Sequence, residues 1–337
     1  MEPVIERLLA SPEPSIRWKT RVHVLGESPT SRPVRALQRE IRDSPRVRRL
    51  LSGRNAAGRL APVRNVYDKW RGAHWVLATL ADLGYPPGDR SLAPLRDQVL
   101  EYWLRPQYYR EFTVEKKSQV YRQMGVPIMQ GRHRRCASQQ GNALWSVLTL
   151  GLADARAGQL VERLLHWQWP DGGWNCDRNP AASHSSFMES ILPLRALART
   201  ARETGDPQAG QAAERAAEIF LKRNLFKRQR DGAVMRPGFV ELHYPLYWHY
   251  DLLHGLKVIA EAGLVGDPRC KDALDLLETK RLPDGGWPAE KRFYRTTGKA
   301  ASGAERVDWG GASKRRTNEW VTVDALHVLR AAGRSED

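Results

Sequence analysis

The chain has 337 residues, with 54 Lys and Arg against 38 Asp and Glu, which gives a formal net charge of +16. No apolar run reaches the roughly 18 residues of a transmembrane helix, and the first residues lack the apolar core of a signal peptide. Three cysteines, an odd number, give no disulfide framework, so we expect a cytoplasmic protein without a membrane span.

Helix stop and start signals recur along the whole chain. Apolar runs end in Leu-Gly or Ala-Gly, and a short turn with Pro or Asp-Pro then leads into a charged amphipathic run. The pattern predicts helix pairs that repeat every roughly 50–65 residues within one domain, residues 1–337. Outer helices are expected near residues 2–9, 33–52, 91–104, 156–168, 207–223 and 268–280. Inner helices are expected near residues 15–25, 70–83, 136–150, 184–199, 246–262 and 319–332.

An identical tetrapeptide, Asp-Gly-Gly-Trp, occurs at residues 171–174 and 284–287, each time after a proline. Proline fixes φ, Asp bonds the backbone beyond it, and Gly accepts positive φ, so the segment forms a turn. The tryptophan is a flat apolar plate with one N–H donor, suited to wedging between helices. We therefore predict an almost wholly helical fold in which Trp174 and Trp287 pack between repeats.

The segment from Gln168 to Trp174 resembles the QW-type motif of the terpenoid cyclase and protein prenyltransferase superfamily; the second copy, residues 280–287, lacks the glutamine. This resemblance implies an all-α fold, an α/α toroid of six inner and six outer helices around a central cavity. It also implies a squalene-cyclase-like or prenyltransferase-like protein. Such a protein would act on an isoprenoid or another apolar ligand with an anionic group in an aromatic cavity.

The motifs that carry the chemistry of that superfamily are missing. Squalene-type cyclases protonate their substrate with an Asp-x-Asp-Asp motif, whereas here Asp251 stands alone in an inner-helix context. Prenyltransferase β subunits hold zinc with Asp-x-Cys and a distant His, and this chain has no Asp-x-Cys. The reaction, and whether the protein is an enzyme, therefore stay open at this point.

Candidate site residues are those near the starts of the inner helices, which converge on one mouth of a toroid. Asp251 in an aromatic-lined cavity would have a raised pKa and could donate a proton, with His249 and His184 as catalytic partners. The alternative role for Asp251 is a helix cap or a salt bridge. We expect Cys136, His184, Tyr247, His249, Asp251 and Trp320 to line one pocket. Further candidate ligand-binding residues are Trp70, His74, Trp248 and Glu319.

A zinc ion is the one cofactor that the sequence suggests. Cys136, Cys176, His184 and His243 are ligand types that a ring of helices could bring together. The chain has no C-x-x-C or H-x-x-x-H pair, so the alternative is that the cysteines are small buried residues and the histidines form hydrogen bonds.

Two basic runs directly precede inner helices, and they predict an anion site at the cavity mouth. Helix N-termini add to the field of arginines, which bind phosphate in bidentate geometry. A phosphorylated small molecule is the expected ligand, while a solvated basic surface, a membrane surface or nonspecific nucleic-acid binding are alternatives. The second function class is thus a non-enzymatic basic helical-repeat protein that binds nucleic acid or another polyanion. The two runs contain Arg132, Arg134, Arg135, Lys314, Arg315 and Arg316.

Overall fold

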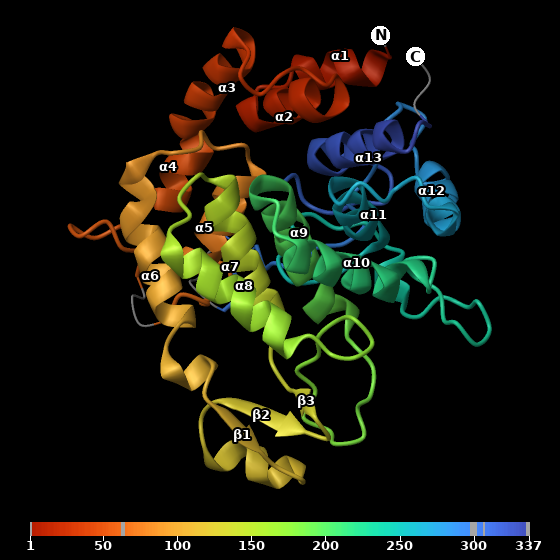
Figure 1. The fold of residues 1–337 in the computed structure, drawn as a ribbon. Coiled ribbons are helices and arrows are strands. Elements are labelled where there is room, and N and C mark those ends of the chain that lie inside the picture. Colours follow the sequence, from red (N-terminus) through yellow and green to blue (C-terminus); the bar gives the residue numbers. More distant parts are fainter. Residues whose placement is uncertain (1, 62–64, 297–301, 306, 335–337) are drawn as a thin grey trace.

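The structure, a computed structural model, describes residues 2–61, 65–296, 302–305 and 307–334. Its helices alternate along the chain between an inner ring and an outer layer (Figure 1). The inner helices are α2 (Pro14–Lys19, continued by a π-helical turn, Thr20–Val24), α5 (Ala73–Asp82), α7 (Ala137–Thr149), α9 (Phe187–Thr204), α11 (Leu252–Glu261) and α13 (Glu319–Ala331). The outer helices are α1 (Pro3–Leu9), α3 (Arg32–Arg42), α4 (Pro45–Leu51), α6 (Ala93–Trp103), α8 (Ala155–Trp167), α10 (Pro207–Leu221) and α12 (Lys271–Glu278).

The six inner helices form a closed ring. Successive inner helices pack against one another from α5 through α7, α9 and α11 to α13, and α13 packs on α2 and its π-helical turn. The ring closes between α2 and α5, where Lys19 Nζ lies 2.8 Å from Asp82 Oδ2. Together with the outer layer, this arrangement is an α/α toroid, which confirms the predicted fold class.

Most helices start where a polar side chain meets a free backbone N–H. Ser31 and Ser44 accept hydrogen bonds from the backbone N–H groups of Val34 and Val47, and each is followed closely by a proline. Asp206 caps α10 in the same way before Pro207. These caps satisfy donors that have no partner within the helix, and proline in the first turn removes another. Most predicted helix boundaries agree with the structure within a few residues. Two do not: the helix expected at residues 33–52 is divided into α3 and α4 by the Ser44-Pro45 helix start, and the helix expected at residues 246–262 begins only at Leu252, after the Asp251 cap.

The two Asp-Gly-Gly-Trp segments adopt the same conformation. The indole N–H of Trp174 donates to the carbonyl of Leu164 (3.0 Å), and that of Trp287 donates to the carbonyl of Leu277 (2.8 Å), in the preceding outer helix. Gly172 and Gly285 both have positive φ, +103° and +82°, as the turn requires.

Each turn is also tied to the next inner helix. The backbone N–H of Trp174 donates to Ser190 Oγ on α9, and that of Trp287 donates to Thr322 Oγ1 on α13. Both rings are buried, with 1% and 0% exposure. Each segment thus joins an outer helix to the following inner helix, and the tryptophans pack between repeats as predicted.

A small β-sheet was not anticipated. It consists of β1 (Glu111–Thr113), β2 (Val126–Met129) and β3 (Arg132–His133), between α6 and α7, and it lies below the helical ring in Figure 1. β1 pairs parallel with β2, and β2 pairs antiparallel with β3. Strands of two to four residues are too short to produce a detectable alternation of apolar and polar residues, so the sequence gives no signal for them.

Across the described residues, no helix combines the length and the hydrophobicity that are needed to cross a bilayer.

We predict that Trp174→Ala lowers the free energy of unfolding by roughly 3–5 kcal/mol, because it removes a buried ring and leaves a cavity. Urea denaturation followed by circular dichroism measures this loss. Met124→Ala is the control, since the Met124 side chain is 67% exposed and its truncation should change stability by less than about 0.5 kcal/mol. A loss below about 1 kcal/mol for Trp174→Ala would contradict the structural role of the turn.

Candidate functional site

Four charged side chains from four inner helices meet at the centre of the ring. Lys19 Nζ lies 2.8 Å from Asp82 Oδ2 and 3.5 Å from Asp324 Oδ1. Lys257 Nζ lies 3.2 Å from Asp82 Oδ1 and 2.9 Å from Asp324 Oδ2. Each ammonium therefore bridges both carboxylates. We call Lys19, Asp82, Lys257 and Asp324 the central ion network.

The central ion network keeps its carboxylates ionised. Burial alone would raise the pKa of Asp82, but the ammonium groups of Lys19 and Lys257 hold that pKa well below its ordinary value. Asp324 is affected in the same way, and burial of Lys257 is outweighed by the two carboxylates, so the pKa of Lys257 is raised. Neither aspartate is the protonated acid that a cyclase-type reaction needs at its start.

A second ion pair joins Arg195 on α9 to Glu261 on α11. Arg195 donates two hydrogen bonds of 2.6 Å to the carboxylate of Glu261, and its guanidinium lies 3.7 Å from the centre of the Trp145 ring. Although burial opposes ionisation of Glu261, Arg195 lowers the pKa of this carboxyl to about 2. The centre of the toroid is therefore occupied by paired charges and aromatic rings.

The cavity at the N-terminal ends of the inner helices is narrow. Residues 244–247 line a cavity of about 80 Å³ that also contacts the central ion network. Tyr247 stacks on Trp70 with ring centres 3.8 Å apart, and its hydroxyl bonds Glu305. Pockets for drug-sized ligands are about 300–1,000 Å³, so this cavity is too small for such a ligand.

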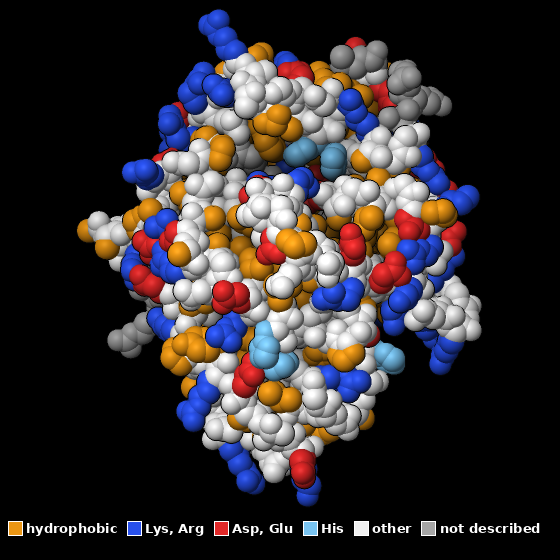
Figure 2. All heavy atoms as spheres, viewed as in Figure 1, with side chains coloured by type: hydrophobic (Ala, Val, Ile, Leu, Met, Phe, Trp, Pro, Cys, Tyr) orange, Lys and Arg blue, Asp and Glu red, His pale blue; other side chains and the backbone are white. Residues whose placement is uncertain are grey.

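The mouth at the opposite, C-terminal ends of the inner helices is open. It contains a pocket of about 310 Å³, which we call the basic pocket. Figure 2 shows a hollow on this face with two histidines at its edge and Lys or Arg side chains deeper inside. The cationic lining residues are Lys19, Arg195, Arg199, Arg202 and Lys257; the others include Trp18, His23, Asp82, Trp145, Thr149, Glu261 and His327.

Several buried donors around the basic pocket have no hydrogen-bond partner among the described residues. These are the indole nitrogen of Trp18, the hydroxyl of Thr149 and Nε of Arg199. Buried polar groups are nearly always hydrogen-bonded in native proteins, so these three atoms are exceptions beside the basic pocket. Burial lowers the pKa of Arg199, and the neighbouring Arg202 adds to this effect.

Comparisons with known proteins give a distant structural likeness. No family model matches the chain, and no curated protein matches it. An unsaturated glucuronyl hydrolase from Bacillus sp. GL1 superposes with a TM-score of 0.45 at 14% identity, over 94% of this chain and 84% of the hydrolase. A type II terpene cyclase from Scytonema, bound to geranylgeranyl dihydroxybenzoate, superposes with a TM-score of 0.28 at 17% identity, over 86% and 96% of the two chains.

Asp251 caps a helix. It is fully buried, and its carboxylate accepts hydrogen bonds from the backbone N–H groups of His254 (2.9 Å) and His243 (2.8 Å). The side chain of His243 also contacts it at 3.3 Å. The structure thus shows the capping alternative for Asp251, which directs its oxygens to the backbone and away from the central cavity.

The six residues expected in one pocket are separated. Tyr247 lines the central cavity, whereas His184 is exposed on a loop. His249 stacks on Phe293, with ring centres 3.6 Å apart, and also on Trp248. Trp320 lines a surface pocket of about 500 Å³ together with Glu319 and Arg316. The prediction assumed that residues near the starts of inner helices all face the central cavity. It was wrong because these residues lie variously in helix caps, at the rim and in the core.

Two further predicted ligand-binding residues are part of the core. Trp70 packs edge-on against Trp75, with ring centres 4.9 Å apart, besides its stacking on Tyr247. His74 is buried, and its Nδ1 accepts a 3.1 Å hydrogen bond from the indole N–H of Trp103. Both side chains are therefore packing residues at the N-terminal ends of the inner helices.

Of the four residues predicted to bind zinc, the structure brings two, Cys136 and Cys176, close together. The ligand atoms of Cys136, Cys176 and Glu189 lie within 4.8 Å of one another, and Cys176 Sγ lies 3.2 Å from Glu189 Oε1. His184 is exposed, and His243 is buried against Asp251. Burial raises the pKa of Glu189, and the pKa of the Cys176 thiol is raised by Cys136 and by burial. These three residues could hold a metal ion with a Cys₂Glu ligand set.

The predicted basic rim does not form. Arg134 and Arg135 are buried, at 3% and 9% exposure; Arg134 donates to the carbonyl of Ala182, and Arg135 lies over the ring of Tyr108. Arg315 is exposed. The two basic runs precede α7 and α13, which have no inner-helix neighbour in common and lie on opposite sides of the ring.

Sequence reasoning missed the central ion network and the basic pocket. A signal was present, because Asp82, Lys257 and Asp324 each stand between apolar residues within an expected inner helix. A charge in such a position is rarely buried without a partner. Three such charges of both signs on different inner helices predict buried ion pairs at the centre of the ring.

We predict that acid destabilises the protein between about pH 6.5 and pH 4. Burial lowers the pKa of His23 and His74 to about 3 and that of His254 to about 4. Below pH 6.5 the unfolded chain binds protons at these histidines while the folded protein does not, so the free energy of unfolding falls. The slope approaches about 1.4 kcal/mol per pH unit for each histidine. Urea denaturation at several pH values measures this slope. His74→Gln should lower it by the contribution of one histidine, about 1.4 kcal/mol per pH unit. An unchanged slope would refute the lowered pKa of His74.

We also predict that Asp251→Ala costs at least about 2 kcal/mol of stability, because it removes a cap and leaves two buried N–H groups without an acceptor. Asp251→Asn keeps one acceptor oxygen and should cost less. Chemical denaturation of both variants measures the difference. Equal losses for Ala and Asn would show that the capping hydrogen bonds do not determine the effect.

Proposed function

We propose that the protein binds a small ligand carrying a phosphate or diphosphate group in the basic pocket. The observation that carries this proposal is the convergence of five cationic side chains on one pocket of about 310 Å³. Asp82 and Glu261 also line the pocket, Asp324 lies against its two lysines and Glu203 pairs with Arg199, so positive charge still exceeds negative charge by one. Arginine donors match phosphate oxygens in geometry and in charge.

The available donors come mainly from one face of α9. Arg195, Arg199 and Arg202 are spaced by four and three residues and therefore share one side of the helix. Arg195 is held by Glu261, while Arg199 bonds Glu203 at 2.7 Å and Arg202 donates to the carbonyl of Glu261 at 2.7 Å. A guanidinium has five N–H donors, so Arg199 and Arg202 retain donors for an anion.

The basic pocket favours a compact ligand. Asp82 and Lys257 of the central ion network line both this pocket and the cavity of about 80 Å³ at the N-terminal ends, so the network lies between the two spaces. An isoprenoid chain therefore has no continuous path through the ring, and an apolar part of the ligand would rest against Trp18 and Trp145 at the entrance. This arrangement supports recognition of the anionic group over enclosure of a long hydrocarbon.

The histidines at the pocket are neutral at physiological pH. Burial lowers the pKa of His23 to about 3 and also lowers the pKa of His327. Nδ1 of His327 donates to the backbone carbonyl of His23 at 3.2 Å, which leaves Nε2 as an acceptor. The positive field of the pocket therefore comes from Lys and Arg, and anion binding should change little between pH 7 and pH 8.

Calorimetric titration of the full chain with diphosphate, orthophosphate and a prenyl diphosphate tests the proposal. We expect saturable binding of diphosphate that weakens at least about tenfold in Arg199→Ala/Arg202→Ala, since each charged hydrogen bond contributes about 1.5–3 kcal/mol. The matched control is Arg315→Ala/Arg316→Ala, which removes the same charge from the opposite mouth and should bind as the wild type does.

The alternatives give different results in the same experiment. Equal weakening in both variants would indicate a diffuse charge effect and would overturn the proposal. A single-stranded oligonucleotide that binds with a steep salt dependence, unaffected by the pocket variant, would support the nucleic-acid alternative on the outer surface. Tighter binding of prenyl diphosphate than of diphosphate would show that the apolar tail adds contacts at the entrance.

A further inference from the structure

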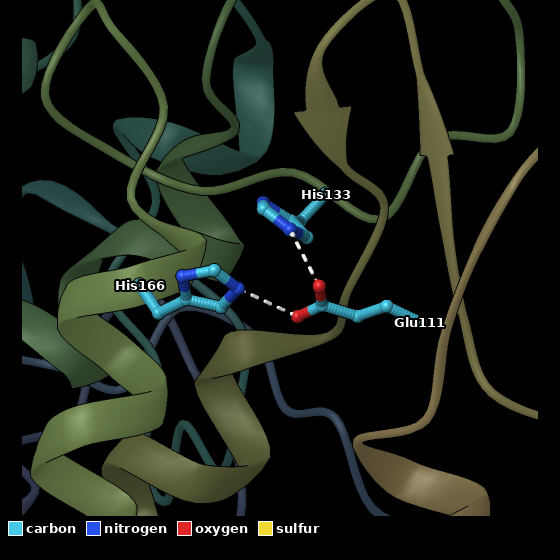
Figure 3. Close-up of side chains that lie close together, drawn as sticks. All are labelled: Glu111, His133 and His166. Carbon is cyan, nitrogen blue, oxygen red and sulfur yellow. Dashed lines mark hydrogen bonds and ion pairs between the residues drawn. The ribbon is translucent and has the colours of Figure 1, made fainter.

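A cluster of metal-ligand side chains lies outside the helical ring, between the small sheet and an outer helix. Glu111 is on β1, His133 is on β3 and His166 is in the last turn of α8. Their side chains point toward one another in Figure 3, and their ligand atoms all lie within 4.8 Å of one another. We propose that these three residues bind Zn²⁺ or a similar divalent transition-metal ion.

The ligand atoms are close enough to share one ion. His166 Nε2 lies 2.8 Å from Glu111 Oε1, and His133 Nε2 lies 3.4 Å from the other oxygen, Glu111 Oε2. Zinc–nitrogen and zinc–oxygen bonds of about 2.0–2.2 Å place neighbouring ligand atoms about 3.3–3.6 Å apart in a tetrahedron. The His133 distance matches that range, whereas the His166 distance is that of a hydrogen bond, so His166 and Glu111 must move apart by about 0.5 Å when an ion replaces the shared proton.

The surrounding residues orient the ligands. The indole N–H of Trp167 donates to Glu111 Oε1 at 3.1 Å, and the indole N–H of Trp169 donates to the backbone carbonyl of His133 at 2.8 Å. Such supporting hydrogen bonds fix first-shell ligands in metal sites. His133 Nε2 is buried, and its contact with Glu111 Oε2 at 3.4 Å lacks the geometry of a regular hydrogen bond, so this nitrogen can turn toward a metal ion at little cost.

The charges at the cluster also favour a cation. Glu111 offers a carboxylate oxygen, and His133 and His166 each offer an imidazole nitrogen, which are ligand types that zinc binds in proteins. His166 ends α8, where the helix dipole attracts positive charge.

Two histidines and one carboxylate leave a position for a fourth ligand. The side chains of His133, Glu111 and His166 are 15%, 27% and 51% exposed, so solvent reaches the ion. Catalytic zinc sites have three protein ligands and an open position of this kind, whereas structural sites are closed. An ion here would also join β1 and β3 to α8, because the three ligands come from these three elements.

The test compares Zn²⁺ binding by the wild type and by variants after removal of metal with a chelator. Cys136, Cys176 and Glu189 form a second cluster that could bind Zn²⁺, so every protein in the test carries Cys136→Ser/Cys176→Ser. We expect that this background protein still binds one Zn²⁺, and that His166→Ala on this background weakens binding at least about tenfold. His184→Ala is the matched control, because His184 is an exposed histidine outside the cluster, and it should leave the affinity unchanged.

Cobalt substitution identifies the ligands directly. Co²⁺ bound by Glu111, His133 and His166 should give visible bands without the near-ultraviolet charge-transfer absorption that thiolate ligands produce. Thermal melts without metal confirm that His166→Ala folds. Loss of all Zn²⁺ binding in Cys136→Ser/Cys176→Ser, or unchanged affinity in His166→Ala, would overturn the proposal and would leave Glu111 as a carboxylate bridging two imidazoles.

Discussion

The central ion network determines how the toroid is closed. Lys19, Asp82, Lys257 and Asp324 come from four inner helices that are far apart in sequence, and each charge contacts two opposite charges. Removal of one partner from a buried pair typically costs about 3–5 kcal/mol, because the remaining charge stays buried without compensation. Since each ammonium must meet both carboxylates, the network also fixes the relative heights of α2, α5, α11 and α13. That cost is the penalty for an unpaired buried charge and not the net stability of the network, so the network chiefly constrains how the four helices are placed relative to one another.

The same network makes the two mouths of the ring different. On one side, the hydroxyl of Tyr244 donates to Asp82 at 2.8 Å, which anchors the segment that narrows the cavity at the N-terminal mouth. On the other side, Lys19 and Lys257 form the floor of the basic pocket. A terpene-cyclase-like cavity needs an open interior and a protonated acid, and the paired charges supply neither. The residues of the ring are instead arranged to present positive charge at the C-terminal ends of the inner helices, where the helix dipoles alone would favour cations.

Sequence reasoning identified the helices well and the site poorly, for physical reasons. Helix ends are determined locally, by glycine, proline and capping residues, so they can be read from short segments. Asp251 before Leu252 is such a local capping signal, and the structure shows that role. The ion network depends on contacts between residues up to 305 positions apart, such as Lys19 with Asp324, whose partners no local pattern specifies. The cluster of Glu111, His133 and His166 likewise depends on the fold of a sheet too short to be predicted.

The two Asp-Gly-Gly-Trp units show how a candidate site can be added to a repeat. Gln168 and Arg281 occupy equivalent positions and both donate to the carbonyl of the second residue of the motif, Gly172 or Gly285. The flanking positions differ: His166, Trp167 and Trp169 in the first unit correspond to Thr279, Lys280 and Leu282 in the second. In the first unit these three side chains all contact Glu111 or His133 of the small sheet. The turn that joins the helices is thus shared, whereas the residues around the proposed metal site distinguish one unit from the other. Because Trp174 holds this turn against α8, the position of His166 relative to Glu111 depends on the same packing that stabilises the repeat.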